Sequence, residues 1–366
     1  MFYFKNKNIK KKILFFLTVC LSVQISQVAA AENPAAEHSQ TDSAESFNLK
    51  EMIFEHIGDA YEWHLFSIGQ KHVSIPLPVI VMSSNTGSWH VFSSSRLAHG
   101  ERYEGFYISA SEQHKGKIVE NIGGAEKRPL DLSLTKNALA ICFACIILLA
   151  VFLTLAKSYR KEPLMSRKGF AGSLEMLTMS VHEDVIKPCV GHDYARFAPY
   201  LLTAFYFIFV CNLMGLIPFF PFGANITGNI SVTFVLAMFT FVITNLFGRK
   251  AYWKEIFWPD VPVLLKAPVP IMPLVELLGI FTKPFALMIR LFANMMSGHM
   301  IILVFVGLIF LFKGMMGTGV AGGVSLLAAL FSVFMLTLDV LISFIQAYVF
   351  TILSAIFIGL ARAEHH

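Results

Sequence analysis

Charged residues are scarce in this 366-residue chain: Lys, Arg, Asp and Glu make up only 14% of it, whereas hydrophobic residues make up 55%. A soluble domain carries about 25% charged residues, so this composition excludes an ordinary soluble protein and indicates a chain that lies mostly in a membrane. The net charge of +5 is small, and the basic residues cluster at the ends of apolar runs. Membrane topology explains that clustering, so no nucleic-acid partner is expected.

Cysteine is also rare, with five residues in all and none between positions 32 and 134. That section therefore has no disulfide framework. Cys142 and Cys145 fit C-x-x-C by spacing alone inside an apolar run, and we assign them no redox role. The histidines of residues 31–134 show no tight ligand spacing such as H-x-x-x-H, so we expect neither a metal nor a cofactor. The chain also lacks a G-x-x-x-x-G-K-[ST] loop, so we expect no direct nucleotide binding.

The N-terminal section predicts export. Residues 1–30 combine five lysines, a short apolar run at 13–23 and small residues, which is the pattern of a signal peptide. An uncleaved first span is the alternative, but the run is well below the ~20 residues that a membrane helix needs. We therefore expect residues 31–134 to form an exported domain. Aromatic and β-branched segments at 61–68, 72–82, 88–92 and 103–109 predict a mostly β fold, whose function the sequence does not reveal.

Residues 135–366 predict an all-α polytopic membrane domain with about five to six membrane helices. Spans are expected at 138–156, 200–220 and 232–247, and an amphipathic helix on the membrane surface at 170–190, which Pro188 should end. Two apolar stretches, about 272–312 and 325–361, exceed the ~30 Å hydrocarbon core at about 1.5 Å per residue. They predict a hairpin of two long tilted helices that turns among the glycines at 314–323. The basic residues after the spans predict an outer N-terminus and a cytoplasmic C-terminus.

One of these long helices carries rare polar residues: Glu276, Lys283, Arg290, Asn294 and His299. An arginine in the middle of a membrane helix costs ~2.5–3.5 kcal/mol, so it needs a partner, a water-filled cavity or a passing ion. Glu276, Lys283 and Arg290 are spaced by sevens and share one helical face. A packing salt bridge and an ion pathway gated by Arg290 are both open interpretations, and we favour the pathway.

The other long helix carries Asp339 and Gln346, again seven apart. A membrane Asp is costly unless it is paired, hydrated or neutral, and His299 is its natural counterpart. A histidine and an aspartate that share protons form a relay, and a purely structural pair is the alternative. Asn212, inside the span at 200–220, is either an interhelical hydrogen-bonding residue or a part of the pathway.

The segment RLFAN at 290–294, followed by Gly298, resembles the signature of subunit a of the bacterial rotary (F-type) ATP synthase. The resemblance extends from about residue 170 to the C-terminus. It includes NLMGLIP at 212–218, NIT at 225–227, Lys283-Pro284 and Gln346-Ala347. Gly215 departs from the pattern, since some members carry an acidic residue there.

The resemblance implies a non-catalytic, proton-translocating stator subunit of the inner membrane, with the c-ring and subunit b as partners. It implies that Arg290 is the essential arginine facing a c-ring carboxylate, with Gln346 opposite and Asn294 one turn on. It also implies two proton half-channels, and the residues matched to them are His299, Asp339 and Asn212 on the outer side and Glu276 toward the cytoplasmic exit.

Two other classes of function are weighed against this one. A stand-alone secondary transporter predicts internal repeats with matching broken helices, and the two long helices do not resemble one another. A membrane-anchored binding protein gives no reason for Arg290, His299, Asp339 and Gln346 to lie in membrane helices. We therefore favour the ion-translocating stator.

Overall fold

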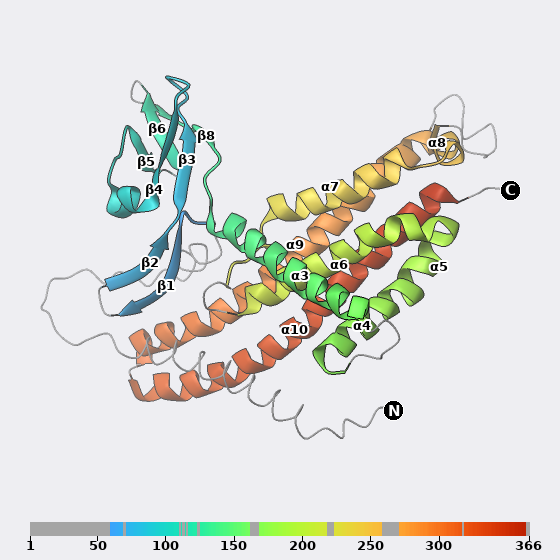
Figure 1. Cartoon of the computed structure of the whole chain (residues 1–366). Helices are drawn as coiled ribbons and strands as arrows, with labels where there is room; N and C mark the ends of the chain where they lie inside the picture. Colours follow the sequence, from blue (N-terminus) through green and yellow to red (C-terminus); the bar gives the residue numbers. More distant parts are fainter. Residues whose placement is uncertain are drawn as a thin grey trace, which may run out of the picture. The chain divides into compact units, whose positions relative to one another are not determined.

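The computed structural model describes residues 59–68, 71–109, 111, 114, 116–122, 125–161, 168–217, 223–257, 271–316 and 318–363 (Figure 1). The expected signal peptide, residues 1–30, lies outside them. The chain divides into two compact units, which are described one after the other. The first unit comprises Met1–Phe143, Ile217–Ala224 and Ile302–Val333, and the second comprises Ala144–Leu216, Asn225–Ile301 and Phe334–His366.

The N-terminal part of the first unit is built from short antiparallel strands, as predicted. They form a two-stranded sheet, β1-β2, and two three-stranded sheets with the orders β4-β3-β8 and β5-β6-β7. The strands are β1 (Glu62–Ile68), β2 (Lys71–Pro76), β3 (Pro78–Met82), β4 (Trp89–Ser93), β5 (Phe106–Ile108), β6 (Ile118–Ile122), β7 (Ala125–Lys127) and β8 (Leu130–Asp131), with a 3₁₀ helix, η1, at Ser94–Gly100.

The β-rich segment predicted at 72–82 contains two strands, and β2 and β3 belong to different sheets. Pro76 and Pro78 flank the break, and proline cannot donate to a sheet ladder. Between them, the Leu77 amide donates to Ser94 Oγ at 3.0 Å and the Leu77 carbonyl accepts from the Ser94 amide at 3.0 Å. Both backbone groups of Leu77 therefore bond to Ser94 at the start of η1 and are not available to a neighbouring strand.

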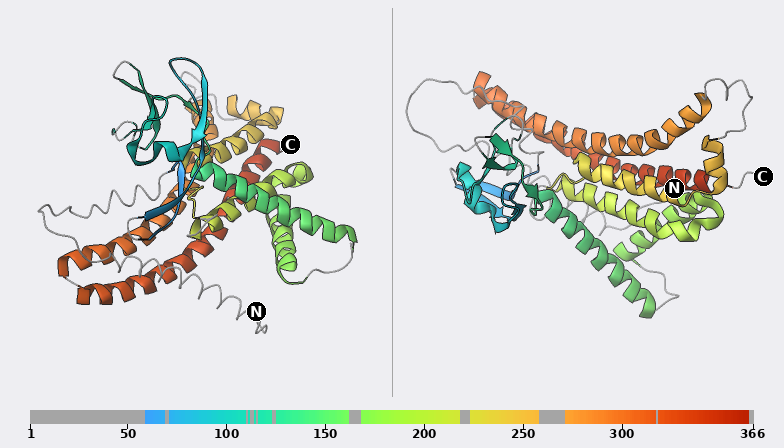
Figure 2. Two further views of the ribbon diagram at one scale, coloured as in Figure 1. Left: turned by 60° about the vertical axis from the view of Figure 1, so that its left-hand side comes forward. Right: turned by 90° about the horizontal axis from the view of Figure 1, so that it is seen from above.

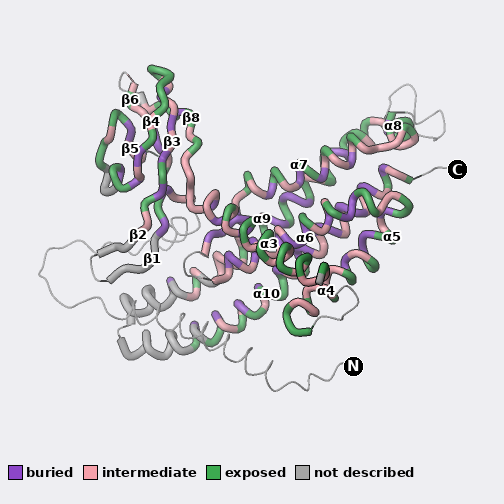
Figure 3. Tube along the Cα trace, in the orientation of Figure 1, coloured by how far each residue is buried: buried purple, intermediate pink, exposed green. Residues whose placement is uncertain are grey.

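Alternation along β3 builds the core of the β region. Val79 and Val81 are fully buried, whereas Pro78, Ile80 and Met82 are more exposed, so burial alternates along the strand (Figure 3). They pack with Tyr61, Phe92 and Phe106 and with two further buried side chains, Leu97 and Ile118.

The described residues from 136 onward are mostly helical, which confirms a polytopic helical fold. Among the residues that the structure describes, four helices are long and apolar enough to cross a membrane, or up to five if the bent pair α7–α8 counts as one span. The helices are α3 (Lys136–Lys161), α4 (Phe170–Ser180), α5 (Lys187–Val190), α6 (Tyr194–Leu216), α7 (Ile230–Leu246), α8 (Lys250–Phe257), α9 (Ile271–Met316) and α10 (Thr318–Arg362).

The predicted helix end at Pro188 is wrong. A π-helical turn, Val181–Ile186, joins α4 to α5, and the helix continues through Pro188 until Gly191, where φ is 76°. The π-helical turn explains this passage, because the Lys187 amide donates to the His182 carbonyl five residues back, so the i→i−4 ladder is already interrupted where Pro188 lacks its N–H. A positive φ suits glycine, so Gly191 supplies the stop.

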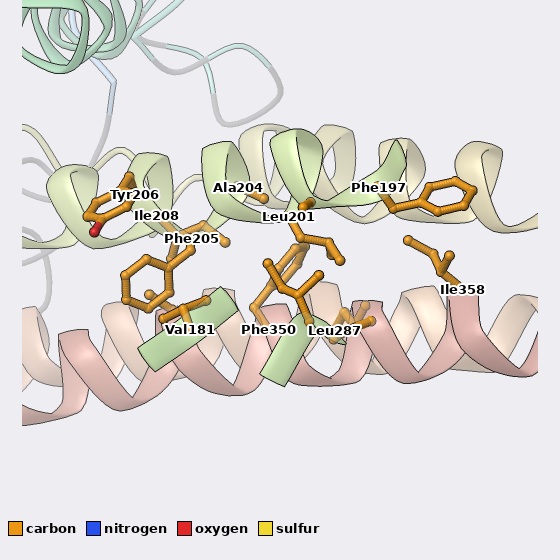
Figure 4. Packing of buried hydrophobic residues seen from close by; sticks show 14 of the residues in the cluster. Val181, Phe197, Leu201, Ala204, Phe205, Tyr206, Ile208, Leu287, Phe350 and Ile358 are labelled. Atoms are coloured by element: carbon orange, nitrogen blue, oxygen red, sulfur yellow. The ribbon is translucent and has the colours of Figure 1, made fainter. Parts of the chain in front are cut away.

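The core of the second unit lies where α6 crosses α9 and α10. Leu201 and Phe205 of α6 point toward Phe350 of α10 and Leu287 of α9, and Phe197 lies farther along α6, near Ile358 of α10 (Figure 4). The apolar side of the 170–190 segment joins the same core through other side chains, Val181, Ile186 and Val190. That face is therefore covered by the unit's own helices.

The helices α9 and α10 form the predicted long hairpin and run side by side (Figure 1, Figure 2). They contain 46 and 45 residues, so each is roughly 70 Å long. The turn is shorter than the predicted glycine segment, because α9 extends to Met316 and α10 begins at Thr318. The later glycines, Gly319, Gly322 and Gly323, are helical.

Candidate functional site

Arg290 lies on the exposed face of α9, near the middle of the membrane-capable part of that helix. Its neighbours on this face are small and also exposed: Ala286 one turn before it, Ala293 and Ser297 after it. Among the described residues, no ion pair or hydrogen bond reaches the Arg290 guanidinium group. The salt-bridge interpretation therefore finds no partner in the described part of the chain.

One turn further on, α9 and α10 are joined by a polar contact. The Asn294 Nδ2 donates to Gln346 Oε1 at 2.6 Å. Gln346 is 3% exposed, whereas Asn294 is exposed. The structure thus brings Gln346 to Asn294, and the buried Gln346 side chain holds the exposed Asn294 side chain through this hydrogen bond.

Asp339 is buried in the interface between α9 and α10, with 6% of its surface exposed. Its carboxyl group lies directly against the α9 backbone at Gly298, where an added Cβ would be 3.0 Å from Oδ1 and 3.2 Å from Oδ2. Gly298 immediately precedes the half-buried His299. The two residues expected to share protons are therefore brought to the same level of the hairpin. No described group donates a hydrogen bond to Asp339 Oδ2.

Asn212 is fully buried in α6, and its partner is a loop residue. Thr227 Oγ1, in the turn between α6 and α7, donates to Asn212 Oδ1 at 2.6 Å. The turn between α6 and α7 is polar in sequence but not exposed, because Asn225 is 6% exposed and Thr227 is completely buried. Sequence reasoning matched this turn to a family and assigned it no role in the site. Its burial next to Asn212 makes Thr227 a site residue.

Packing of α6 on α10 places Asn212 near Asp339 in height. The rings of Phe209 and Phe344 lie 5.9 Å apart, and the two helices run in opposite directions. Asn212 is three residues beyond Phe209 and Asp339 is five residues before Phe344. At about 1.5 Å per residue, their heights differ by roughly 3 Å.

We use the name Asp339 cluster for the buried polar residues at about this height of the second unit: Asn212, Asn225, Thr227, Asp339 and Ser343. Four of its atoms find no hydrogen-bond partner in the described part of the chain: Asn212 Nδ2, Asn225 Nδ2, Asp339 Oδ2 and Ser343 Oγ. Buried polar atoms without protein partners are costly, and ordered water is their usual partner. The cluster offers both donors and acceptors to water.

Glu276 lies at the opposite end of the second unit, 14 residues before Arg290 or about 21 Å along α9. It is half-buried, and its charge acts on Tyr252 of α8. Tyr252 lines a small pocket together with Lys283 and Asn245. The Lys283 Nζ lies 5.8 Å from the centre of the Phe357 ring. Arg290 thus stands between two polar regions, the Asp339 cluster and the Glu276 end.

Comparison with known proteins identifies the family of most of the chain. Residues 138–359 match the family model "ATP synthase A chain". Residues 52–135 match a second model, described as a domain of unknown function (DUF8433).

Individual relatives carry the same description. ATP synthase subunit a of Chloroherpeton thalassium is 41% identical over 240 residues, which cover 64% of this chain and 68% of that protein. ATP synthase subunit a 2 of Chlorobaculum tepidum is 45% identical over 240 residues, 64% of each chain. ATP synthase subunit a of Myxococcus xanthus is 40% identical over 253 residues, 68% of this chain and 78% of that protein. This chain therefore belongs to the ATP synthase subunit a family, the multi-pass, proton-translocating stator subunits of the ATP synthase membrane sector.

Proposed function

We propose that Arg290 is the electrostatic gate of this subunit and faces a carboxylate of the c-ring. The observation that carries the proposal is the exposed guanidinium group, which no described residue pairs, in the middle of a membrane-capable helix. A charge in that position is stable only against a counter-charge or water. A ring carboxylate that arrives beside it is held ionised by the opposite charge and releases its proton.

The surface around Arg290 suits a close partner helix. Ala286, Ala293 and Ser297 are exposed on the same face and are all small. Small residues let the backbones of two membrane helices approach closely. A ring helix can therefore pass at short range, with Arg290 as the one long side chain on this strip of α9.

Two half-channels would meet at Arg290 from opposite ends. Asp339, His299 and Asn212 would carry protons on the outer side, and Glu276 would carry them on the cytoplasmic side. Along α9, Gly298 is about 12 Å beyond Arg290 and Glu276 about 21 Å before it. A proton on either path meets a fixed positive charge before it reaches the other path, so it crosses only on a rotating ring carboxylate. The membrane potential supplies about 2.3 kcal/mol per charge per 100 mV for this transfer.

The same proposal fixes orientation and partners. The chain lies in the bacterial inner membrane, with residues 1–30 removed as a signal peptide, residues 31–134 in the periplasm and the C-terminus in the cytoplasm. It has no catalytic centre of its own and assembles with the c-ring and subunit b. The two family matches support a domain boundary at 134/135, because one ends at residue 135 and the other begins at residue 138. Across this boundary, the Lys136 amide donates to the Ala60 carbonyl at 2.9 Å, and the Asn137 amide donates to Asp59 Oδ1 at 3.1 Å. The first membrane helix therefore starts on the β region.

The test is ATP-driven proton pumping in inverted vesicles that carry the whole complex with Arg290→Ala. Acidification should be abolished while the c-ring still co-purifies with the chain. Arg196→Ala is the matched control, because Arg196 is also an exposed arginine of a membrane-capable helix, and its guanidinium group packs 4.4 Å from the centre of the Phe247 ring. This variant should pump normally.

Normal pumping by Arg290→Ala would show that the arginine is not the gate. Equal loss in both variants, with the c-ring still bound, would mean that any lost positive charge impairs the complex, and it would refute the specific role of Arg290.

A further inference from the structure

Between Asp339 and Gln346 the outer path has a gap. The two residues are seven apart on α10, which corresponds to about 10.5 Å of helix rise. A proton moves between groups that lie about 2.6–3.2 Å apart, or through one water. A single bridging water spans roughly 6 Å, so one step does not connect Asp339 to the level of the Asn294–Gln346 pair.

Ser343 lies inside this gap. It follows Asp339 by four residues and precedes Gln346 by three, so all three share one face of α10. The rise from Asp339 to Ser343 is about 6 Å, and from Ser343 to Gln346 about 4.5 Å. Each step is then within reach of one water. Asp339 packs against Gly298 and Gln346 bonds to Asn294, so Ser343 faces α9 between these two contacts.

The Ser343 hydroxyl group is not used by the fold. Its residue is 0% exposed, and no described atom accepts from or donates to Oγ. Hydroxyl groups in membrane helices commonly return to the carbonyl four residues earlier. Thr351 does so on the same helix, donating to the Ala347 carbonyl at 2.9 Å. Thr203 does so on α6, at 2.7 Å from the Pro199 carbonyl. Ser343 therefore keeps both its donor and its acceptor capacity for another partner.

The α9 side of the interface offers few hydrogen-bonding groups at the level of Ser343. Met295 of α9 lies between Asn294 and Gly298 in sequence and is 5% exposed. Its thioether sulfur is only a weak acceptor. Water near Ser343 would thus find its strongest protein partner in the serine hydroxyl group.

We propose that Ser343 is a proton-relay residue that connects Asp339 to the rotor-facing level of the hairpin. The proposal rests on the function proposed above and extends its outer half-channel. Protonated Asp339 gives its proton to a water, which passes a proton to Ser343 Oγ, while the original hydroxyl proton of Ser343 leaves to the next water toward the Asn294–Gln346 pair. Asp339 is left as a carboxylate and takes its next proton from the outer side. Rotation about the Cβ–Oγ bond resets the hydroxyl group, and nothing is oxidised or reduced.

The test is potential-driven proton flux through the membrane sector of the whole complex in vesicles. Ser343→Ala should lower flux by roughly tenfold or more, because the hydroxyl step is lost. Thr351→Ala is the matched control: Thr351 is equally buried on the same helix, but its hydroxyl group is already bonded. The control should stay within about twofold of the wild type, and Ser343→Thr, which restores a hydroxyl group, should recover flux.

Flux of Ser343→Ala within twofold of the wild type would overturn the relay, as would an equal loss in Thr351→Ala. If Ser343→Ala does not assemble, Ser343→Cys decides through block of flux by Ag⁺, measured against the parent protein with its native cysteines. Block of Ser343→Cys beyond that background supports a hydrated relay site, and no added block overturns it. Arg290→Ala separates the two proposals: if it abolishes pumping while Ser343→Ala is neutral, only the relay fails.

Discussion

The Asn294–Gln346 hydrogen bond should make an asymmetric contribution to stability. Asn294→Ala leaves the carbonyl of a 97% buried Gln346 without its donor, because Gln346 is only 3% exposed. An unsatisfied buried acceptor costs about 1–3 kcal/mol. Gln346→Ala instead leaves an exposed Asn294, which can bond elsewhere. Interhelical hydrogen bonds in membranes average about 0.6 kcal/mol and reach about 1.7, so we expect a coupling energy of about 0.5–1.5 kcal/mol.

A double-mutant cycle measures this coupling. The two single variants and the double variant are unfolded by SDS in mixed micelles, and the free energy of unfolding is compared with that of the wild type. Asn294→Ala should lower the free energy of unfolding by more than the coupling energy, because it also leaves the Gln346 carbonyl unsatisfied. The double variant should lower the free energy of unfolding by less than the sum of the two single variants. A coupling energy below about 0.3 kcal/mol, within the additivity of distant sites, would refute the reasoning.

Two further outcomes follow from packing and from charge. Gly359→Ala should destabilise the second unit by about 1–3 kcal/mol, because its Cβ would collide with the Cys189 carbonyl; a wild-type unfolding midpoint would contradict this. Burial and the hydrogen bond to Asp131 raise the pKa of Tyr61, so its contribution to stability is present below about pH 10 and lost as the pH rises further. Guanidinium unfolding followed by fluorescence of the buried Trp63 should show the difference between wild type and Tyr61→Phe shrinking above that pH, and a constant difference would argue against it.

The long hairpin could be predicted because it depends on the length of apolar stretches, which can be read directly from the sequence. Apolar stretches much longer than a bilayer core leave few alternatives to long helices, and the lengths of α9 and α10 confirm that part of the prediction, whereas their tilt stays a prediction. Helix ends were harder to place. Pro188 looked like a stop, but the helix passes through it because the π-helical turn before α5 already interrupts the i→i−4 ladder there.

Strand prediction failed where pairing is decided by distant residues. The segment 72–82 is continuous in composition, yet Leu77 bonds to Ser94, 17 residues away, and divides it. The strands β6, β7 and β8 were not predicted. They are two to five residues long and take their place from partners such as β5 and β3. β-propensity depends strongly on such context.

The charged residues of the site could be predicted, because a charge in a membrane helix has a high free-energy cost. Arg290 and Asp339 stand out in apolar helices because each costs several kcal/mol without a partner. Thr227 and Ser343 did not stand out, since hydroxyl residues are common in membrane helices and turns. Their distinguishing property is complete burial, combined with a bond to Asn212 in one case and no described partner in the other. Only three-dimensional structure supplies that information.

The departure at Gly215 gives the outer cluster a specific electrostatic character. Where some family members carry an acid, this chain has a buried glycine, so Asp339 is the one carboxylate among the described members of the Asp339 cluster. Asn212 and Asn225 add neutral Nδ2 donors that no described atom accepts from. Donors of this kind bind water near a carboxylate without contributing a second charge. The inlet we propose therefore concentrates its proton exchange on a single acid, which makes each later step depend on how Asp339 passes its proton on.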